Sequence, residues 1–208
     1  MDELTFRLYL ITDRAATPRP LADVVEECLI AGLRAVQLRE KDLPAWELLG
    51  RAETLRQSTR RHAATLLVND RLDVALAVGA DGVQRTEHSL PVASLRALAA
   101  PPFLIGASVH SVADAEAAEA AGADFIVFGP VYDTASKRRY GPPQGLEALG
   151  RVTASVRRPV IAVGGVTPAR VRECVSAGAA GVAVIGAIMT AERPAEQVKA
   201  FLDALGSA

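Results

Sequence analysis

Polar side chains follow one short apolar segment at intervals of two residues. Gln37, Arg39 and Lys41 alternate with other residues in QLREKD. In an extended strand this spacing puts all three side chains on one side, and burying two cations together is costly unless an anion compensates them. The segment therefore predicts an anion-binding site. The alternative is that Arg39 and Lys41 form surface ion pairs with Glu40 and Asp42.

The rarity of lysine points to the same segment. Of the 23 basic residues only three are lysine, namely Lys41, Lys137 and Lys199. Lysine carries a compact ammonium on a flexible stem, whereas arginine carries a rigid fork. Lys137 falls in the polar stretch 129–143, which we interpret as a lid that closes over an anion, with a solvated basic loop as the alternative. We expect Lys41, Arg39 and Lys137 to form one cationic cluster and Lys199 to lie on the surface.

Other apolar runs also end in residues that could do chemistry. Asp70, preceded by Asn69, is a candidate Mg²⁺ ligand beside a polyphosphate, because Mg²⁺ in proteins takes one or two carboxylates together with phosphate oxygens. A helix N-cap is the alternative role for this pair. Ser108 and His110 fall on one side of a strand. His110 is a candidate acid or base, with a purely structural histidine as the alternative.

Glycines near the end of the chain predict a second anion site. Gly164 and Gly165 precede Thr167 and Pro168, which suit the N-cap and the first position of a helix. Gly186 ends another apolar run. In (β/α)₈ barrels, backbone N–H groups of the last two strand–helix loops often bind phosphate. We therefore expect a phosphate monoester to bind here.

A repeated strand–helix unit must position these residues. Short runs rich in β-branched residues alternate with longer stretches of helical periodicity. Near-continuous apolar runs such as FIVFGPV are typical of parallel strands covered on both faces. The predicted strands are Arg7–Asp13, Ala35–Glu40, Thr65–Asp70, Gly82–Arg85, Phe103–Val109, Phe125–Val131, Pro159–Val166 and Gly181–Ile188. The predicted helices span about 20–31, 43–61, 71–78, 91–99, 111–121, 144–156, 168–177 and 194–205.

An internal repeat favours closure of these strands into a ring. An Ala-Gly or Val-Gly pair introduces the segments 31–38, 78–85, 121–128 and 177–184. The glycine suits a left-handed helix C-cap just before a strand. The four copies precede the second, fourth, sixth and eighth predicted strands. We therefore predict the α/β class, with a single (β/α)₈ TIM-barrel domain over 1–208, rather than an open doubly wound sheet.

Composition excludes several functional classes. The net charge is −1 and aromatic residues make up 4% of the chain, so we expect neither nucleic acid nor an anionic membrane as a partner. The first ten residues lack the basic start of a secretory signal, and no apolar run is long enough to span a bilayer. We expect a cytoplasmic protein with small phosphorylated substrates, in which Cys28 and Cys174 are buried. The oligomeric state stays open, a homo-oligomer included.

Several motifs in a fixed order resemble the thiamine phosphate synthase family, which also contains a thiazole tautomerase branch. The resemblance covers nearly the whole chain. It implies a transferase that joins hydroxymethylpyrimidine diphosphate to a thiazole phosphate and releases pyrophosphate. The motifs that carry it are LYLITD, QLREKD, LLVNDRLDVALAVGADGV, IGASVHS, GADFIVFGPVYDTASK, and VIAVGGVTP with GVAVIGAI.

The resemblance also implies roles for individual residues. Asp70 would bind Mg²⁺, and Ser108 would lie near the pyrimidine. The diphosphate would be held by Gln37, Arg39, Lys41, Asn69 and Lys137. The thiazole phosphate would be bound by Thr134, Ser136, Gly165, Ile185 and Gly186. From their places at strand ends, we assign Gln84 and Gly164 as further substrate-binding residues.

One segment departs from the family pattern. Synthases usually read like DGVHLGQED after the fourth strand, and the final acid is a second Mg²⁺ ligand; here Gln84 replaces the histidine and Ser89 the acid. We assign Glu87 as the substitute ligand. The glutamine and the missing acid also suit the tautomerase branch, which moves one proton on a thiazole carboxylate phosphate, with His110 as acid or base and without Mg²⁺. The retained residues 37–41 and 69–70 favour the synthase. The tautomerase and a non-catalytic binder of thiamine precursors are the alternatives.

Overall fold

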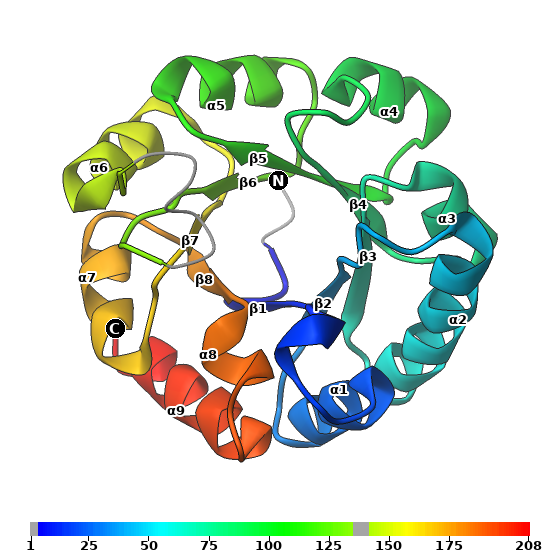
Figure 1. Cartoon of the computed structure of the whole chain (residues 1–208). Helices are drawn as coiled ribbons and strands as arrows, with labels where there is room; N and C mark the ends of the chain where they lie inside the picture. Colours follow the sequence, from blue (N-terminus) through cyan, green and yellow to red (C-terminus); the bar gives the residue numbers. More distant parts are fainter. Residues whose placement is uncertain (1–3, 135–141) are drawn as a thin grey trace.

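Eight parallel strands close into a barrel that is surrounded by helices (Figure 1). The computed structural model describes residues 4–134 and 142–208. Each strand pairs with the next one along the chain, and β8 pairs with β1. The strands are β1 (Leu8–Ile11), β2 (Ala35–Leu38), β3 (Thr65–Asn69), β4 (Gly82–Arg85), β5 (Leu104–Val109), β6 (Phe125–Phe128), β7 (Val160–Val163) and β8 (Gly181–Val184). The predicted (β/α)₈ barrel is confirmed, and the open sheet is excluded.

The helices follow the predicted order with three differences. The short helix η1 lies at Arg14–Ala16, where no helix is predicted. Residues 186–188, predicted as strand, begin the helix α8, and the predicted helix 168–177 is divided into η3 and α7. Within the described ranges, no helix is both long enough and apolar enough to span a membrane. The helices are η1 (Arg14–Ala16), α1 (Leu21–Ile30), α2 (Ala45–Arg61), α3 (Leu72–Ala77), α4 (Val92–Leu98), α5 (Val112–Ala120), α6 (Gly145–Ser155), η3 (Pro168–Arg170), α7 (Val171–Ser176), α8 (Gly186–Met189) and α9 (Pro194–Gly206).

Strand alternation separates two apolar layers. Outward-facing residues such as Leu38 and Val68 join the large core between strands and helices, which also contains the buried thiols of Cys28 and Cys174. Inward-facing residues form a smaller cluster in the barrel. Its aromatic members Phe6, Tyr9 and Phe125 have ring centroids 5.3 to 5.9 Å apart. This packing fills the barrel interior, so chemistry must take place at a barrel end.

The repeated glycines end helices in one common way. Gly32, Gly79, Gly122 and Gly178 all have positive φ, between 60° and 109°. After each of them, the next residue donates a hydrogen bond to a carbonyl five positions earlier, as Leu33 does to Cys28. This is the Schellman geometry, which favours glycine because a Cβ disfavours left-handed φ. The repeat thus sets where four helices stop and the even-numbered strands begin.

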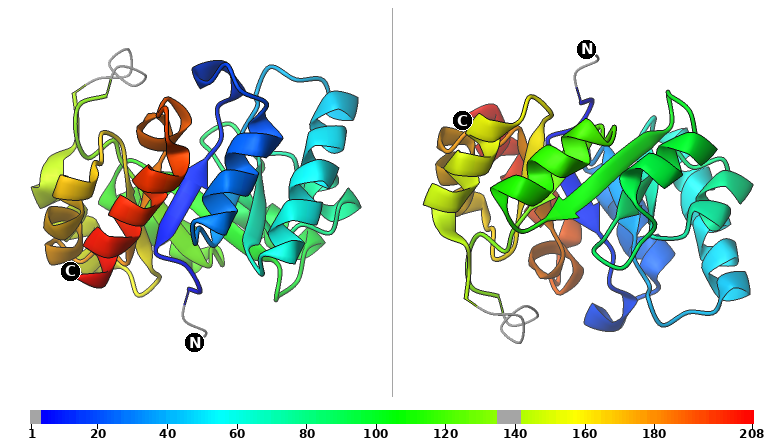
Figure 2. Two further views of the ribbon diagram at one scale, coloured as in Figure 1. Left: turned by 90° about the horizontal axis from the view of Figure 1, so that it is seen from below. Right: turned by 90° about the horizontal axis from the view of Figure 1, so that it is seen from above.

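Most strands end earlier than predicted, and the polar residues lie just beyond the ladder. Gly164, predicted within the seventh strand, has a φ of 100°, and Asp70, predicted to end the third, has a φ of 66°. Such residues leave the extended conformation that pairing requires. Figure 2 shows η1 and α8 at the barrel end where the strands finish, and the start of β1 at the opposite end. The candidate residues within the described ranges therefore gather at the carboxyl end of the barrel.

Candidate active site

Amide side chains form a buried polar layer across β2 to β5. Gln37 Nε2 donates to Asn69 Oδ1 at 3.1 Å, and Gln84 Nε2 donates to Ser108 Oγ at 3.0 Å. Tyr9 OH donates to Gln84 Oε1 at 3.5 Å. Because Gln84 uses its amide donor on Ser108 Oγ, the Ser108 hydroxyl proton is left to donate elsewhere. The structure brings these predicted residues together at the barrel axis.

Arg39 and Lys41 form no ion pair within the described part of the chain, so the alternative of pairing with Glu40 and Asp42 is wrong. Arg14 takes both acids instead. Its Nη1 lies 3.3 Å from Glu40 Oε2, and its two Nη atoms each lie 2.6 Å from a different oxygen of Asp42. The hydrogen bonds from Arg14 lower the pKa of Asp42 to about 2. Two cations beyond β2 are thus left available to an anion.

A buried carboxylate fixes the backbone from which these cations extend. Glu40 is 5% exposed and accepts from Thr12 Oγ1 at 2.7 Å and from the Arg14 backbone N–H. Thr12 Oγ1 in turn accepts from the Arg39 N–H at 2.9 Å. Neither Thr12 nor Arg14 is among the predicted site residues, and Glu40 is expected only as an alternative ion-pair partner for Arg39 or Lys41. An acid between two cations at a strand end was the available signal, because such an acid must be compensated.

Asp70 occupies a left-handed conformation at the end of β3. Its N–H donates to Gln84 O at 3.0 Å, its φ is 66°, and its side chain is exposed. The N-cap alternative is wrong, because the N-cap of α3 is Arg71, and no side-chain hydrogen bond caps this helix. Aspartate tolerates this conformation better than most residues, although at some cost. No side chain of the described residues hydrogen-bonds the Asp70 carboxylate, which leaves it open to a cation.

The segment after β4 offers a weaker metal-binding set. Ser89 Oγ accepts from Thr86 N–H at 2.9 Å and lies 3.0 Å from Thr86 Oγ1, so its hydroxyl closes a local turn. Glu87 is exposed. Among the described residues, no group of three or more His, Cys, Asp or Glu side chains could enclose a metal ion. Any metal here would need most of its ligands from substrate and water.

One ring nitrogen of His110 is hydrogen-bonded to a backbone carbonyl. Its Nδ1 lies 2.5 Å from Gly129 O. A carbonyl only accepts hydrogen bonds, so Nδ1 carries the proton and Nε2 of the neutral ring is the free acceptor. His110 is exposed just beyond β5, two residues after Ser108. An exposed Nε2 can accept a proton from a bound ligand.

The glycine segments beyond β7 and β8 lie on neighbouring, paired strands. Thr167 precedes Pro168 as the N-cap of η3, as predicted. Gly186 is exposed, and a Cβ built on it meets no atom within 4 Å. Its N–H and that of Ala187 begin α8, where no helical acceptor is available. The loops thus offer open N–H groups of the type that binds phosphate.

Part of the predicted site falls outside the described residues. Ser136 and Lys137 belong to residues 135–141, as does the central part of the predicted lid. Thr134 is described and half-buried. Lys199 is exposed on α9, as expected for a surface lysine. The predicted cluster of Lys137 with Arg39 and Lys41 therefore stays a prediction.

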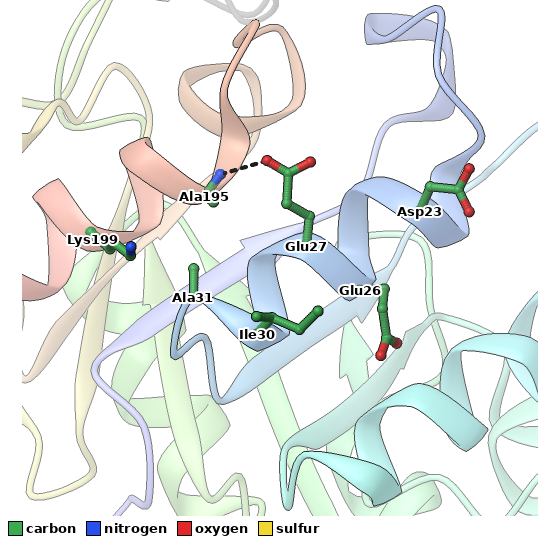
Figure 3. A pocket seen from close by; sticks show the side chains of 7 residues that line it. All are labelled: Asp23, Glu26, Glu27, Ile30, Ala31, Ala195 and Lys199. Atoms are coloured by element: carbon green, nitrogen blue, oxygen red, sulfur yellow. Dashed lines mark hydrogen bonds between the residues drawn. The ribbon is translucent and has the colours of Figure 1, made fainter.

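A cavity of about 400 Å³ lies on the outer wall, between α1 and α9 (Figure 3). Glu27 crosses it to accept from Ala195 N–H at 3.3 Å. None of the candidate residues at the barrel end contributes to it. The residues lining it are Asp23, Glu26, Glu27, Ile30, Ala31, Ala195 and Lys199.

Comparison with known proteins gives full-length matches. A curated protein of Geobacter sulfurreducens is 51% identical over 203 residues, which are 97% of this chain and 95% of that protein. The thiamine-phosphate synthase of Methanoculleus marisnigri is 44% identical over 185 residues, 88% of each. The solved structure of the thiamine phosphate pyrophosphorylase from Pyrococcus furiosus is 39% identical, has a TM-score of 0.89, and is covered over 96% of its length by 97% of this chain.

A family model supports the same relationship. The model described as thiamine monophosphate synthase matches residues 8–188, from β1 into α8. The matched region includes all eight strands and every candidate residue. The chain belongs to the thiamine monophosphate synthase family.

Proposed function

We propose that this chain is a thiamine-phosphate synthase, a transferase that joins hydroxymethylpyrimidine diphosphate to a thiazole phosphate and releases pyrophosphate. Family membership and the names of full-length relatives support this activity. The single structural observation that carries it is the pair of cations Arg39 and Lys41, which Arg14 leaves unpaired by taking the neighbouring acids. A diphosphate needs such charges, whereas a proton transfer on a monophosphate does not.

Departure of the pyrophosphate is the step that these residues assist. The bond between the pyrimidine methylene carbon and the oxygen that links it to the diphosphate breaks. The electrons of this bond leave with the pyrophosphate. Arg39 and Lys41 lower the barrier by stabilising the charge that develops on the leaving oxygens. In our assignment Gln37 and Asn69 orient the same group, and Ser108 donates to the pyrimidine.

The second substrate then supplies the new bond. The thiazole nitrogen donates its lone pair to the methylene carbon, and the product carries a positive thiazolium nitrogen. We assign the thiazole phosphate to the backbone N–H groups around Gly165 and Gly186, with Thr134 beside them. This assignment puts the two anionic groups at separate places on the barrel end, so the substrates bind without mutual repulsion.

The donor set fits Mg²⁺ only as an ion carried largely by the substrate. Asp70 offers a carboxylate without a hydrogen-bond partner among the described side chains, and Mg²⁺ takes one or two carboxylates with phosphate oxygens. When bound, Mg²⁺ would neutralise charge on the departing diphosphate. Glu87 is the second candidate ligand. We expect Ser89→Asp to restore a second carboxylate and tighten Mg²⁺-dependent binding of pyrophosphate; equal affinity in both proteins would contradict the alignment of Ser89 with a metal ligand.

The test is direct synthesis of thiamine phosphate from the two substrates with Mg²⁺. Wild-type protein should form product, and Lys41→Ala should raise KM for the pyrimidine diphosphate about tenfold, as expected for loss of one charge-assisted contact. Lys199→Ala is the matched control, because it removes the same side chain from the outer surface. No product under conditions in which a known synthase works would refute the proposal.

A thiazole tautomerase is the second candidate. It is favoured by the His110 ring, whose Nε2 is the free acceptor, and by the engagement of Ser89 in its own turn. A tautomerase would aromatise a thiazole carboxylate phosphate without pyrimidine substrate or Mg²⁺. Turnover in that assay, together with none in the synthase assay, would select it; phosphate-ester binding without turnover in either would indicate a non-catalytic binder.

A further inference from the structure

Two residues, Arg170 and Tyr132, bind the carbonyl groups of the turn Gly164–Gly165. Arg170 Nη1 donates to Gly165 O at 2.8 Å, and the guanidinium carbon of Arg170 lies 4.4 Å from the centroid of the Tyr132 ring. The backbone N–H of Tyr132 donates to Gly164 O at 3.0 Å. Both carbonyl groups of the turn are thus engaged by Arg170 and Tyr132.

These bonds set the direction of two N–H groups. In a trans peptide, C=O and N–H point in opposite directions, and the cis bonds of the described chain are those before Pro102 and Pro130. The Gly165 N–H therefore points away from Tyr132, and the Val166 N–H points away from Arg170. Neither N–H has a backbone partner within the described residues. Adjacent N–H groups of this kind form an anion-binding concavity.

The turn also packs closely against the segment that follows β6. Gly164 and Gly165 have φ values of 100° and 64°. A Cβ on Gly164 would come within 2.6 Å of Pro130 Cα, and one on Gly165 within 2.6 Å of Asp133 O. The turn is therefore pressed against the segment after β6, and the position of that segment determines the position of the turn.

Tyr132 connects this segment to α7. Its hydroxyl donates to Glu173 Oε2 at 2.7 Å and receives a weak bond from Cys174 Sγ at 3.9 Å. Partial burial and the Glu173 carboxylate both raise the pKa of Tyr132, so the hydroxyl keeps its proton and remains a donor. The ring, held at its outer end, offers Arg170 a fixed face for stacking.

We infer that Arg170 and Tyr132 are positioning residues for the phosphate-monoester half of the site. They set the orientation of the Gly165 and Val166 N–H groups and touch no substrate themselves. The inference rests on the proposed function, in which the thiazole phosphate binds at this turn. The inference predicts an effect on only one of the two substrates, because the diphosphate is assigned to residues of β2 and β3.

The test compares the two KM values in Arg170→Ala. Loss of one hydrogen bond to a carbonyl and of one stacking contact should raise KM for the thiazole monophosphate about tenfold. KM for the pyrimidine diphosphate and kcat should change less than about twofold, because the residues assigned to the diphosphate lie on the other half of the barrel end. Tyr132→Phe keeps the ring beneath Arg170 and loses only the bond to Glu173, so KM for the monophosphate should rise less than in Arg170→Ala.

Arg172→Ala is the matched control, because Arg172 is exposed on α7 and makes no described side-chain contact. It should leave both KM values unchanged. Unchanged values in Arg170→Ala would overturn the inference, as would equal increases for both substrates, which would indicate a general structural role.

Failure of the proposed function gives a different pattern. If wild-type protein forms no product, the inference is judged by calorimetric titration with inorganic phosphate. If phosphate then binds more weakly to Arg170→Ala than to wild type and to Arg172→Ala, the inference is supported even though the protein lacks the proposed activity. Equal binding to all three proteins, or no binding to any, overturns it.

Discussion

A single arginine decides how charge is distributed beyond β2. Arg14, from η1, binds Glu40 and both oxygens of Asp42, although Arg39 and Lys41 are the nearest cations in sequence. The bidentate pair with Asp42 has the geometry that arginine favours over lysine. Arg39 and Lys41 are left without an acidic partner among the described residues, and their charge remains available to a ligand.

Removal of Arg14 should therefore weaken diphosphate binding, although Arg14 itself is not assigned a contact with the ligand. In Arg14→Ala, the released acids are free to pair with Arg39 and Lys41 or to repel the anion. We expect KM for the pyrimidine diphosphate to rise about tenfold, the scale of one lost charge-assisted interaction. Arg14→Ala/Asp42→Asn should recover part of this loss. An unchanged KM in Arg14→Ala, or no recovery in the double variant, would contradict this account.

The ion pairs of Glu40 and Asp42 could be predicted from the sequence only in part. The spacing of Gln37, Arg39 and Lys41 predicts an anion site, because alternation and the cost of burying charge act locally. It did not reveal that Arg14 takes the two acids, because that contact joins residues 26 and 28 positions apart. Only the pairing of β1 with β2 brings η1 to this loop.

At the scale of elements, two aspartates extend the glycine repeat. Asp81 and Asp124 follow Gly79 and Gly122 by two residues. Asp81 accepts from the Leu66 N–H and pairs with Arg56; Asp124 accepts from the Ile105 N–H and pairs with Arg96. Each carboxylate thus ties the start of one strand to its neighbour and to a helix.

Asp124→Asn tests this link. Asparagine keeps an acceptor for the Ile105 N–H but loses the ion pair with Arg96, whose side chain is 18% exposed. We expect a loss of about 1–2 kcal/mol in the free energy of unfolding, as for a partly buried charged hydrogen bond. Asp203→Asn is the control, since Asp203 is exposed on α9. Urea unfolding that finds equal stability for both variants would count against the link.

The repeat made the element order predictable, whereas strand ends were harder to locate. The positive φ that suits Gly122 is a property of glycine itself, so the helix stops could be found from sequence. Residues 186–188 are apolar like the rest of the predicted eighth strand, yet they form α8. Periodicity does not separate a short buried helix from a strand, and here tertiary packing decides.

At the scale of the whole molecule, the outer helices contribute an acid-sensitive contact. Glu26 on α1 lies 2.8 Å from His62 Nε2 and 2.9 Å from Arg61 Nη2 at the end of α2. Hydrogen bonding by His62, with further bonds from Ser58 and Arg61, lowers the pKa of Glu26 from 4.5 to about 2. A lowered pKa in the folded state means that the contact stabilises the fold above pH 4.5 and that this stabilisation is lost as the pH falls towards 2.

Glu26→Gln should therefore flatten the dependence of stability on pH. The variant should be less stable than wild type at pH 6, and the difference should shrink between pH 4.5 and about 2, where wild-type Glu26 takes up its proton. Unfolding by urea at pH 6, 4.5 and 3 measures this. Glu116→Gln, at an exposed position on α5, should show no such convergence. A difference that stays constant with pH would exclude Glu26 as its source.

Ring closure also has a consequence for how the chain is made. Leu8 of β1 pairs with Val182 of β8, and Arg7 Nη1 donates to Leu205 O at 2.6 Å. During synthesis at 5–20 residues per second, β1 therefore waits on the order of 10 s for its second neighbour. Throughout that interval one of its edges can pair with another nascent chain. The ring therefore keeps an open edge until β8 has been made and has paired with β1.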